Sequence, residues 1–293
     1  MSAFHYNFAV LRRIPKSFVE CGCKSDPIHI EKAREEYFQL VETLKKCDLR
    51  VIELEEEEDY PDCCFVDDCA VVIGGTALIT RPGMKTRQGE VGEIRKILRE
   101  LKFKIMEILD PDAIIEGGDV LFTGKEIFVG LGEGRRTNEK GASAVASAFP
   151  EYNVTPIRID GPTQLKSLVS MAGRDIIAVG ASINATKVMQ QIKAVAQFSY
   201  RILKLDSDYA ANMTYVNGRL IHRTREEIGE RSYSTLDEKI LYAKHIVSLS
   251  EIEKAYGKLT SMVLLLDRVK YPKEIVSNIT TQDCIQYSDV SHL

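Results

Sequence analysis

The first candidate for a functional site is a short run rich in carboxylates, Pro61-Asp62-Cys63-Cys64-Phe65-Val66-Asp67-Asp68. Two adjacent carboxylates at the end of a β-rich run, with a third shortly upstream, are costly to bury unless they meet a cation. A guanidinium is the natural partner, because its fork of N–H donors fits a carboxylate bidentately. A solvated turn would have the same composition, so the run alone does not establish a site.

A second acidic run and two arginines on separate loops extend this pattern. In Glu116-Gly117-Gly118-Asp119, the glycines let the backbone approach a neighbouring group closely, although a sharp hairpin would explain them equally well. Arg87 and Arg136 could together hold the carboxylate of an amino acid, or each could lie on the surface or beside a helix cap. Asn138 is typical of an N-cap residue. Carboxylates at one end and arginines at the other would suit a zwitterionic ligand with a cationic side chain.

A repeated order of elements must position these side chains. Apolar periodicity predicts long helices over about residues 30–47, 89–101, 138–149, 185–198 and 234–243. About three short β-rich runs precede each helix, so we interpret the chain as five β-β-α-β units around an axis, an α/β propeller. A doubly wound sheet would instead need simple alternation of strands and helices. Gly130-Leu131-Gly132-Glu133-Gly134 lacks the spacing of a nucleotide-binding loop, and we interpret it as a turn.

Composition argues against several classes of function. The 293 residues are 44% hydrophobic and 28% charged, close to the globular average. With 39 Lys and Arg against 43 Asp and Glu, a net charge of −4 does not suit nucleic acid or anionic lipids. The apolar runs are too short to span a bilayer. We therefore expect neither a nucleic-acid partner nor a membrane.

The seven cysteines indicate a reducing compartment. The chain starts without a secretory signal pattern, so we expect reduced thiols and a cytoplasmic protein. Cys21 and Cys23 have no matching Cys or His pair nearby, which makes a zinc site a weak interpretation. No metal and no cofactor are expected.

Taken in chain order, the polar clusters match a known family. The carboxylate run is followed by Thr76-Ala77-Leu78-Ile79-Thr80-Arg81-Pro82-Gly83 and by Gly117-Gly118-Asp119-Val120-Leu121-Phe122-Thr123-Gly124. Further matches are Arg136-Thr137-Asn138, Leu165-Lys166-Ser167, Ser170-Met171-Ala172-Gly173, Ala210-Ala211-Asn212 and His222-Arg223-Thr224. Over about residues 8–266 the chain resembles dimethylarginine dimethylaminohydrolase. The resemblance implies a five-bladed β/α propeller with pseudo-fivefold symmetry, the fold of guanidino-group-modifying enzymes, and a family reaction that converts methylated arginine to citrulline and a methylamine.

The resemblance also implies roles in substrate binding. The two adjacent aspartates stand where the family grips the guanidino group, the first of them commonly Glu. The upstream aspartate matches a residue near the α-amino end of the substrate, and the two arginines match residues that bind its carboxylate. The expected substrate-binding residues are Asp62, Asp67, Asp68, Arg87, Arg136 and Ser167.

The catalytic pair of the family is replaced. Glu116 fills the acidic position that supports the catalytic histidine, but the best match for that histidine is Gln164. The nucleophilic cysteine follows a Leu-Thr pair, and here Ser261 follows Leu259-Thr260. A serine needs a general base to become nucleophilic, and an amide cannot exchange a proton at neutral pH.

Three hypotheses follow from these replacements. The first is a pseudoenzyme that binds an arginine-like amino acid or another small amine. The second is an active amidino hydrolase that uses relocated groups, for methylarginine or for a diverged reaction. The third is a scaffold with a vestigial pocket and a protein partner.

Two further expectations concern the C-terminal region. We predict one domain over residues 1–271 and an extension over 272–293. The ending Ser291-His292-Leu293 resembles the peroxisomal Ser-Lys-Leu signal, which leaves peroxisomal import as the alternative to the cytoplasm.

Overall fold

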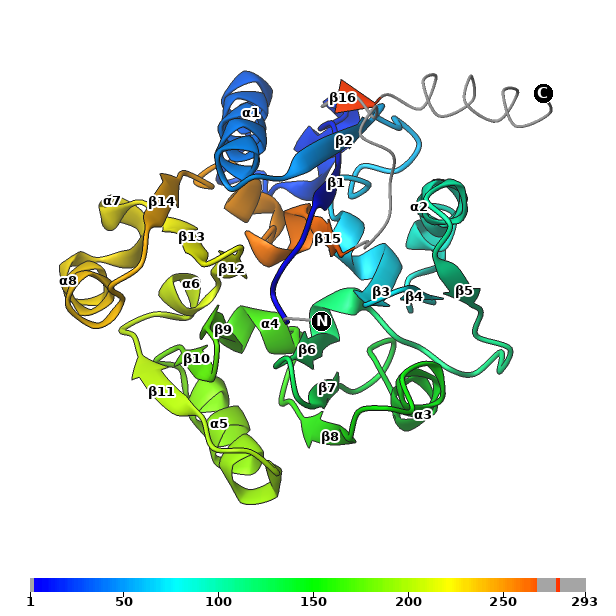
Figure 1. Cartoon of the computed structure of the whole chain (residues 1–293). Helices are drawn as coiled ribbons and strands as arrows, with labels where there is room; N and C mark the ends of the chain where they lie inside the picture. The colour runs from blue at the N-terminus through cyan, green and yellow to red at the C-terminus, as the bar shows by residue number, and fades with distance from the viewer. Residues whose placement is uncertain (1–2, 268–277, 280–293) are drawn as a thin grey trace.

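Five small sheets lie around the centre of the molecule in the computed structural model, which describes residues 3–267 and 278–279 (Figure 1). Four sheets have three strands: β3 (Ala70–Ile73), β4 (Thr76–Ile79) and β5 (Lys104–Met106); β6 (Val120–Phe122), β7 (Ile127–Leu131) and β8 (Val154–Arg158); β9 (Val169–Gly173), β10 (Ile176–Val179) and β11 (Arg201–Lys204); β12 (Thr214–Val216), β13 (Arg219–Arg223) and β14 (Lys244–Val247). The fifth has the order β15 (Leu264–Leu266), β1 (Phe8–Arg12), β2 (Arg50–Leu54) and β16 (Asn278–Ile279).

All five sheets repeat one connection pattern. An antiparallel pair comes first, and a helix then carries the chain to a further strand that pairs in parallel with the second. In the fifth sheet, β15 and β1 form the antiparallel pair and a helix leads from β1 to β2. This β-β-α-β order is the repeat that the sequence predicts.

Long helices cover the outside of the sheets (Figure 1). They are α1 (Ile30–Lys46), α2 (Val91–Glu100), α3 (Glu139–Ala148), α5 (Ile183–Val195) and α8 (Glu230–Lys239), the last preceded by the short α7 (Arg225–Ile228). The first of them, α1, buries Ala33, Tyr37, Leu40, Val41 and Leu44 on one face, which is the stripe that its periodicity predicts. The structure therefore confirms the five helical regions.

Two local predictions need correction. The helix predicted over 234–243 spans Glu230–Lys239, because Ile240 is extended and buried against the core formed with Leu236 while Leu241 is exposed. The segment interpreted as a turn over 130–134 begins as the end of β7, and only Gly132 onward forms the loop. The predicted cap at Asn138 is confirmed, since its side chain accepts a hydrogen bond from the Gly141 amide at 2.9 Å.

The inner edge of every sheet reaches the same central cavity. Residues of β3, β6, β9, β12 and β15, each an edge strand, line this space together with the N-terminal segment. A short helical turn precedes each of these inner strands: η2 (Val66–Cys69), η4 (Gly117–Asp119), α4 (Leu165–Leu168), α6 (Asp208–Ala211) and η6 (Thr260–Met262). These turns pack against one another, so the side chains they carry converge at one end of the inner strands.

Two further expectations concern membrane spans and the C-terminal extension. Within residues 3–267 and 278–279, no helix combines the length and apolar character that a membrane span requires. The predicted extension over 272–293, with Ser291-His292-Leu293, lies outside the described residues apart from β16, which pairs in parallel with β2.

Asn217 joins three separate parts of the fold. It occupies the β12–β13 turn with a φ of 50° and is followed by Gly218, a pair typical of tight hairpins. Its side chain accepts a hydrogen bond from the Tyr6 amide (2.8 Å) and donates to the carbonyls of Tyr6 (2.9 Å) and Cys47 (2.8 Å). One amide group thus fixes the N-terminal segment and the end of α1 against the hairpin.

We predict that Asn217→Gly lowers the free energy of unfolding by about 2 kcal/mol, because it keeps the left-handed backbone but removes these hydrogen bonds. Asp175→Gly is the matched control, since Asp175 has a φ of 57° and its side chain forms an exposed ion pair with Lys125. That control should change stability by about 0.5 kcal/mol or less. Equal effects of the two variants in urea unfolding would contradict the assignment.

Candidate functional site

Asp68 is the centre of a buried network of charges and amides. Its Oδ2 accepts from Arg87 Nη1 at 2.7 Å, and its Oδ1 accepts from the Gly118 amide at 3.0 Å and from Gln164 Nε2 at 2.9 Å. Asp68 is 3% exposed, so the solvated turn considered for this run is excluded. Burial alone would raise the pKa of Asp68, but Arg87 and the hydrogen bonds outweigh it and hold that pKa below its usual value.

Arg87 is shared between two carboxylates of the protein. Besides Asp68, it donates to both carboxylate oxygens of Glu90, at 3.2 and 2.9 Å, and to the Phe65 carbonyl at 3.3 Å. All three charged side chains are buried. The guanidinium expected beside the first carboxylate run is therefore present, and it comes from the chain itself.

The glycines before β6 are required by close packing. A Cβ on Gly117 would lie 1.8 Å from the carbonyl oxygen of Asp67, and one on Gly118 would lie 2.3 Å from the Gln164 side-chain oxygen. The close backbone approach considered for this run is thus observed. It lets the Gly118 amide reach Asp68.

Gln164 bridges two acidic side chains. Its Nε2 donates to Asp68 at 2.9 Å and to Glu116 Oε2 at 3.0 Å. Burial, followed by the charge of Asp68, raises the pKa of Glu116 to about 7. A carboxyl group that titrates near neutral pH and an amide that does not titrate therefore stand side by side.

Arg136 closes the network on the far side of Glu116. Its Nη2 donates to Asp119 at 3.0 Å, its Nη1 donates to the Pro162 carbonyl, and its Nε lies 3.8 Å from Glu116. Asp119 also accepts from the Thr137 hydroxyl at 2.6 Å. Arg136, like Arg87, is thus engaged with carboxylates of the protein, and its expected role toward a ligand carboxylate stays a prediction.

Asp67 points to a different partner from Asp68. Its Oδ2 lies 2.5 Å from Lys166 Nζ, which belongs to α4. Burial raises the pKa of Asp67 to about 6, although Lys166 opposes the shift. Sequence reasoning did not give Lys166 a role, although the residue stands in the Leu165-Lys166-Ser167 motif.

The remaining predicted residues make local contacts. The Ser261 hydroxyl accepts from the Lys258 amide and donates to the Lys258 carbonyl, both at 2.8 Å. Asp62 accepts from the Cys21 thiol at 2.8 Å. Ser167 is buried within α4. The structure thus joins Asp68, Arg87, Glu116, Gln164 and Arg136 directly. The substrate-binding roles of Asp62 and Ser167 and the catalytic position of Ser261 stay predictions.

Sequence reasoning missed Glu90 as well as Lys166. The signal for Glu90 was its spacing of three residues from Arg87, which places the two on one face of a turn.

In the described part of the chain, no group of three or more His, Cys, Asp or Glu side chains is arranged to hold a metal ion.

Comparison with known proteins identifies the family. The family description "N,N dimethylarginine dimethylhydrolase, eukaryotic" matches residues 16–217, more than half of the chain. This chain belongs to the dimethylarginine dimethylaminohydrolase (DDAH) family. The human protein named DDAH2 is 34% identical over 271 residues, covering 88% of this chain and 93% of that protein.

Bacterial DDAH relatives extend the similarity to solved structures. The dimethylarginine dimethylaminohydrolase of Pseudomonas aeruginosa is 26% identical over 241 residues, covering 80% of this chain and 88% of that protein. A cysteine-to-serine variant of the Pseudomonas DDAH, in complex with citrulline, has a TM-score of 0.77 and 24% identity, covering 90% of this chain and 100% of that chain. The DDAH fold therefore extends over nearly the whole chain.

We predict that Arg87→Met destabilises the protein by about 3–5 kcal/mol, because it leaves the buried carboxylates of Asp68 and Glu90 without their counter-charge. Arg95→Met is the matched control: its ion pair with Glu107, at 2.8 Å, is partly exposed to solvent and should contribute about 1 kcal/mol or less. Chemical unfolding of both variants measures the difference. A loss at Arg87 no larger than that at Arg95 would show that the network does not support the fold.

Proposed function

We propose that this DDAH-family protein binds an arginine-like amino acid or a related small amine and does not hydrolyse it.

We further propose that residues 1–271 form a five-bladed β/α propeller with pseudo-fivefold symmetry. Support for this architecture comes from the five repeated β-β-α-β units and from the contribution of every inner edge strand to one cavity.

The charge balance of the buried network carries the proposal. Five carboxylates surround three cations; the carboxylates are Asp67, Asp68, Glu90, Glu116 and Asp119, and the cations are Arg87, Arg136 and Lys166. Glu116 is the carboxylate with the weakest pairing, since its nearest cation lies 3.8 Å away and its pKa is raised to about 7. A cationic side chain placed beside Glu116 would offset this excess of negative charge.

The same contacts argue against hydrolysis. Gln164 uses its N–H donors on two carboxylates and has no proton to exchange at neutral pH. The Ser261 hydroxyl donates a hydrogen bond to the Lys258 backbone carbonyl. A carbonyl cannot take up the proton, whereas a nucleophilic serine needs a general base that can. Cys21 does not supply a relocated thiolate, because burial and then Asp62 raise the pKa of its thiol.

Binding does not depend on the missing nucleophile, because that group acts mainly in the transition state. The complex of citrulline with a cysteine-to-serine variant of the Pseudomonas relative supports this point for the fold. Asp62, Arg136 and Ser167 are the proposed contacts for the amino-acid end of the ligand, and Asp67, Asp68 and Glu116 for its guanidino end. Arg87 does not contact the ligand in this proposal; it holds the Asp68 carboxylate in position through their ion pair.

We predict that arginine binds with a Kd of roughly 1 μM–1 mM and more tightly at pH 8 than at pH 6. A cation favours the ionised form of Glu116, whose pKa of about 7 leaves it mostly protonated at pH 6, so affinity rises as pH passes through that value. Citrulline, with an uncharged side chain, should lack this dependence. Calorimetry with arginine, methylarginines, citrulline and simple amines measures both effects.

Glu116→Gln is the decisive variant for binding. It should weaken arginine binding by about 1.5–3 kcal/mol, the range for a charge-assisted hydrogen bond, and should abolish its pH dependence. Glu107→Gln, at an exposed ion pair, serves as the control and should change neither. Failure of every ligand to bind the wild-type chain would favour the protein-interaction scaffold.

We predict no citrulline formation from dimethylarginine, because the nucleophile and the proton carrier are both absent. Mass spectrometry of long incubations with purified protein tests this expectation. Turnover that disappears in Ser261→Ala or Cys21→Ala would establish a relocated mechanism. In the double variant Gln164→His with Ser261→Cys, any citrulline formed would place both residues in the catalytic positions of the family.

We also propose a cytoplasmic location. The six cysteines of the described chain are free thiols, which suits a reducing compartment. Deletion of Leu293 from a fluorescent fusion distinguishes this location from peroxisomal import through the C-terminal tripeptide.

A further inference from the structure

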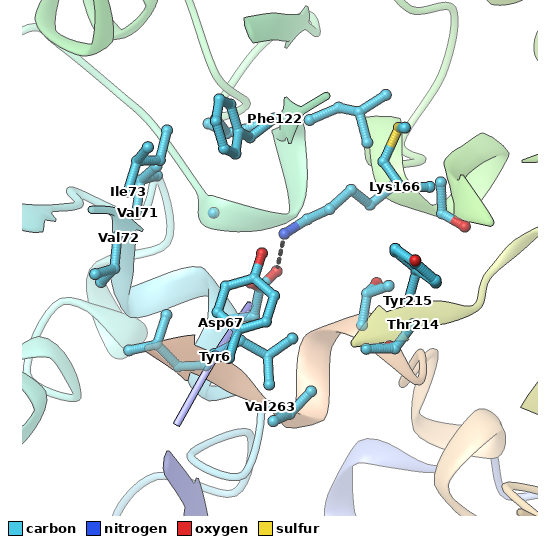
Figure 2. A pocket seen from close by; sticks show the side chains of 18 of the residues that line it. Tyr6, Asp67, Val71, Val72, Ile73, Phe122, Lys166, Thr214, Tyr215 and Val263 are labelled. Atoms are coloured by element: carbon cyan, nitrogen blue, oxygen red, sulfur yellow. Dashed lines mark ion pairs between the residues drawn. The ribbon is translucent and has the colours of Figure 1, made fainter. Parts of the chain in front are cut away.

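A cavity of about 140 Å³ lies where the five inner strands meet (Figure 2). Each sheet contributes to its wall, for instance through Val71, Leu121, Met171, Thr214 and Leu264. Of the buried charged network, only Asp67 and Lys166 line this space, whereas Asp68, Glu116 and Gln164 do not. The cavity thus shares Asp67 with the candidate arginine site but extends away from the rest of it, along the inner strands, and the chemistry of that part is not explained by the proposed function.

The wall of the cavity is mainly apolar and partly aromatic. Phe4, Tyr6, Phe122 and Tyr215 contribute rings, and aliphatic side chains form much of the rest. The polar side chains of the lining are Asp67, Lys166, Ser170, Thr214 and Thr260. Figure 2 shows the residues Val71, Val72 and Ile73 on the side opposite Thr214 and Tyr215, with the Asp67–Lys166 ion pair between the two sides. A flat ring would contact such a lining well, because aromatic side chains pack favourably against other rings.

One polar group in the wall lacks a partner. Thr214 is 7% exposed, and its hydroxyl makes no hydrogen bond within the described residues. A buried hydroxyl without a partner costs free energy that a ligand hydroxyl could recover. The Ser170 hydroxyl, by contrast, donates to the Ala211 carbonyl at 2.6 Å, and the Thr260 hydroxyl accepts from Asn212 at 2.8 Å.

We propose that this cavity binds a small monocyclic aromatic molecule with one hydroxyl group, such as a phenol or a benzyl alcohol. The volume supports a single ring, because an apolar cavity of about 150 Å³ holds benzene in an engineered lysozyme. The ring packs against the aromatic and aliphatic wall, and the ligand hydroxyl pairs with Thr214. The site shares only Asp67 with the proposed arginine contacts and does not require a ligand beside Asp68 or Glu116.

Calorimetric titration of the full chain with phenol, and separately with benzene, tests the proposal. Phenol should bind the wild-type protein, and Thr214→Val should weaken its binding about fivefold, the loss expected for one hydrogen bond. Benzene binding should be unaffected by that variant. Val72→Phe, which fills the cavity, should abolish binding of both molecules, whereas Thr186→Val on the exposed face of α5 should change neither.

Three results would overturn the proposal. The first is no binding of phenol by the wild-type protein at millimolar concentration. The second is phenol binding that Val72→Phe leaves intact, which decides the matter even if Thr214→Val does not fold. The third is displacement of phenol by arginine, which would place phenol in the candidate arginine site.

Discussion

The structure depends on the need to neutralise carboxylates that are buried where five sheets converge. Asp68 is almost fully buried, and it remains ionised only because Arg87, Gln164 and the Gly118 amide all reach it. Each partner comes from a different segment of the chain. The glycines before β6, the helical turn before β3 and the start of α4 must therefore keep their relative positions. Because an unpaired carboxylate in the interior would be strongly destabilising, the pairing of Asp68 constrains the positions of all the segments that contact it.

The order of elements could be predicted from the sequence because it depends on local patterns. Helical periodicity located α1 and the other long helices, and the β-rich runs between them revealed the repeat. The partners of individual side chains could not be predicted in the same way. Gln164 lies 96 residues from Asp68 and 48 from Glu116, so no spacing within one element indicates these contacts.

The arginines show this limit most clearly. Arg87 and Arg136 were expected to meet the carboxylate of a ligand, but both meet carboxylates of the protein. From sequence alone, the number of carboxylates that compete for a guanidinium is unknown, because Glu90 and Asp119 gain their importance only through burial. The family relation supplied the residues of the site, and the structure supplied the contacts among them.

The sheet that contains both β1 and β15 has a consequence for how the chain reaches its native state. The other four sheets are each made of consecutive strands and can pair while later parts of the chain are still unstructured. Pairing of Phe8 with Leu266 joins segments from opposite ends of the described chain, and its loop-closure entropy is correspondingly large. We therefore expect the pairing of β1 with β15 to form last during folding. On the ribosome, β1 would remain without its antiparallel partner until synthesis has passed Leu266.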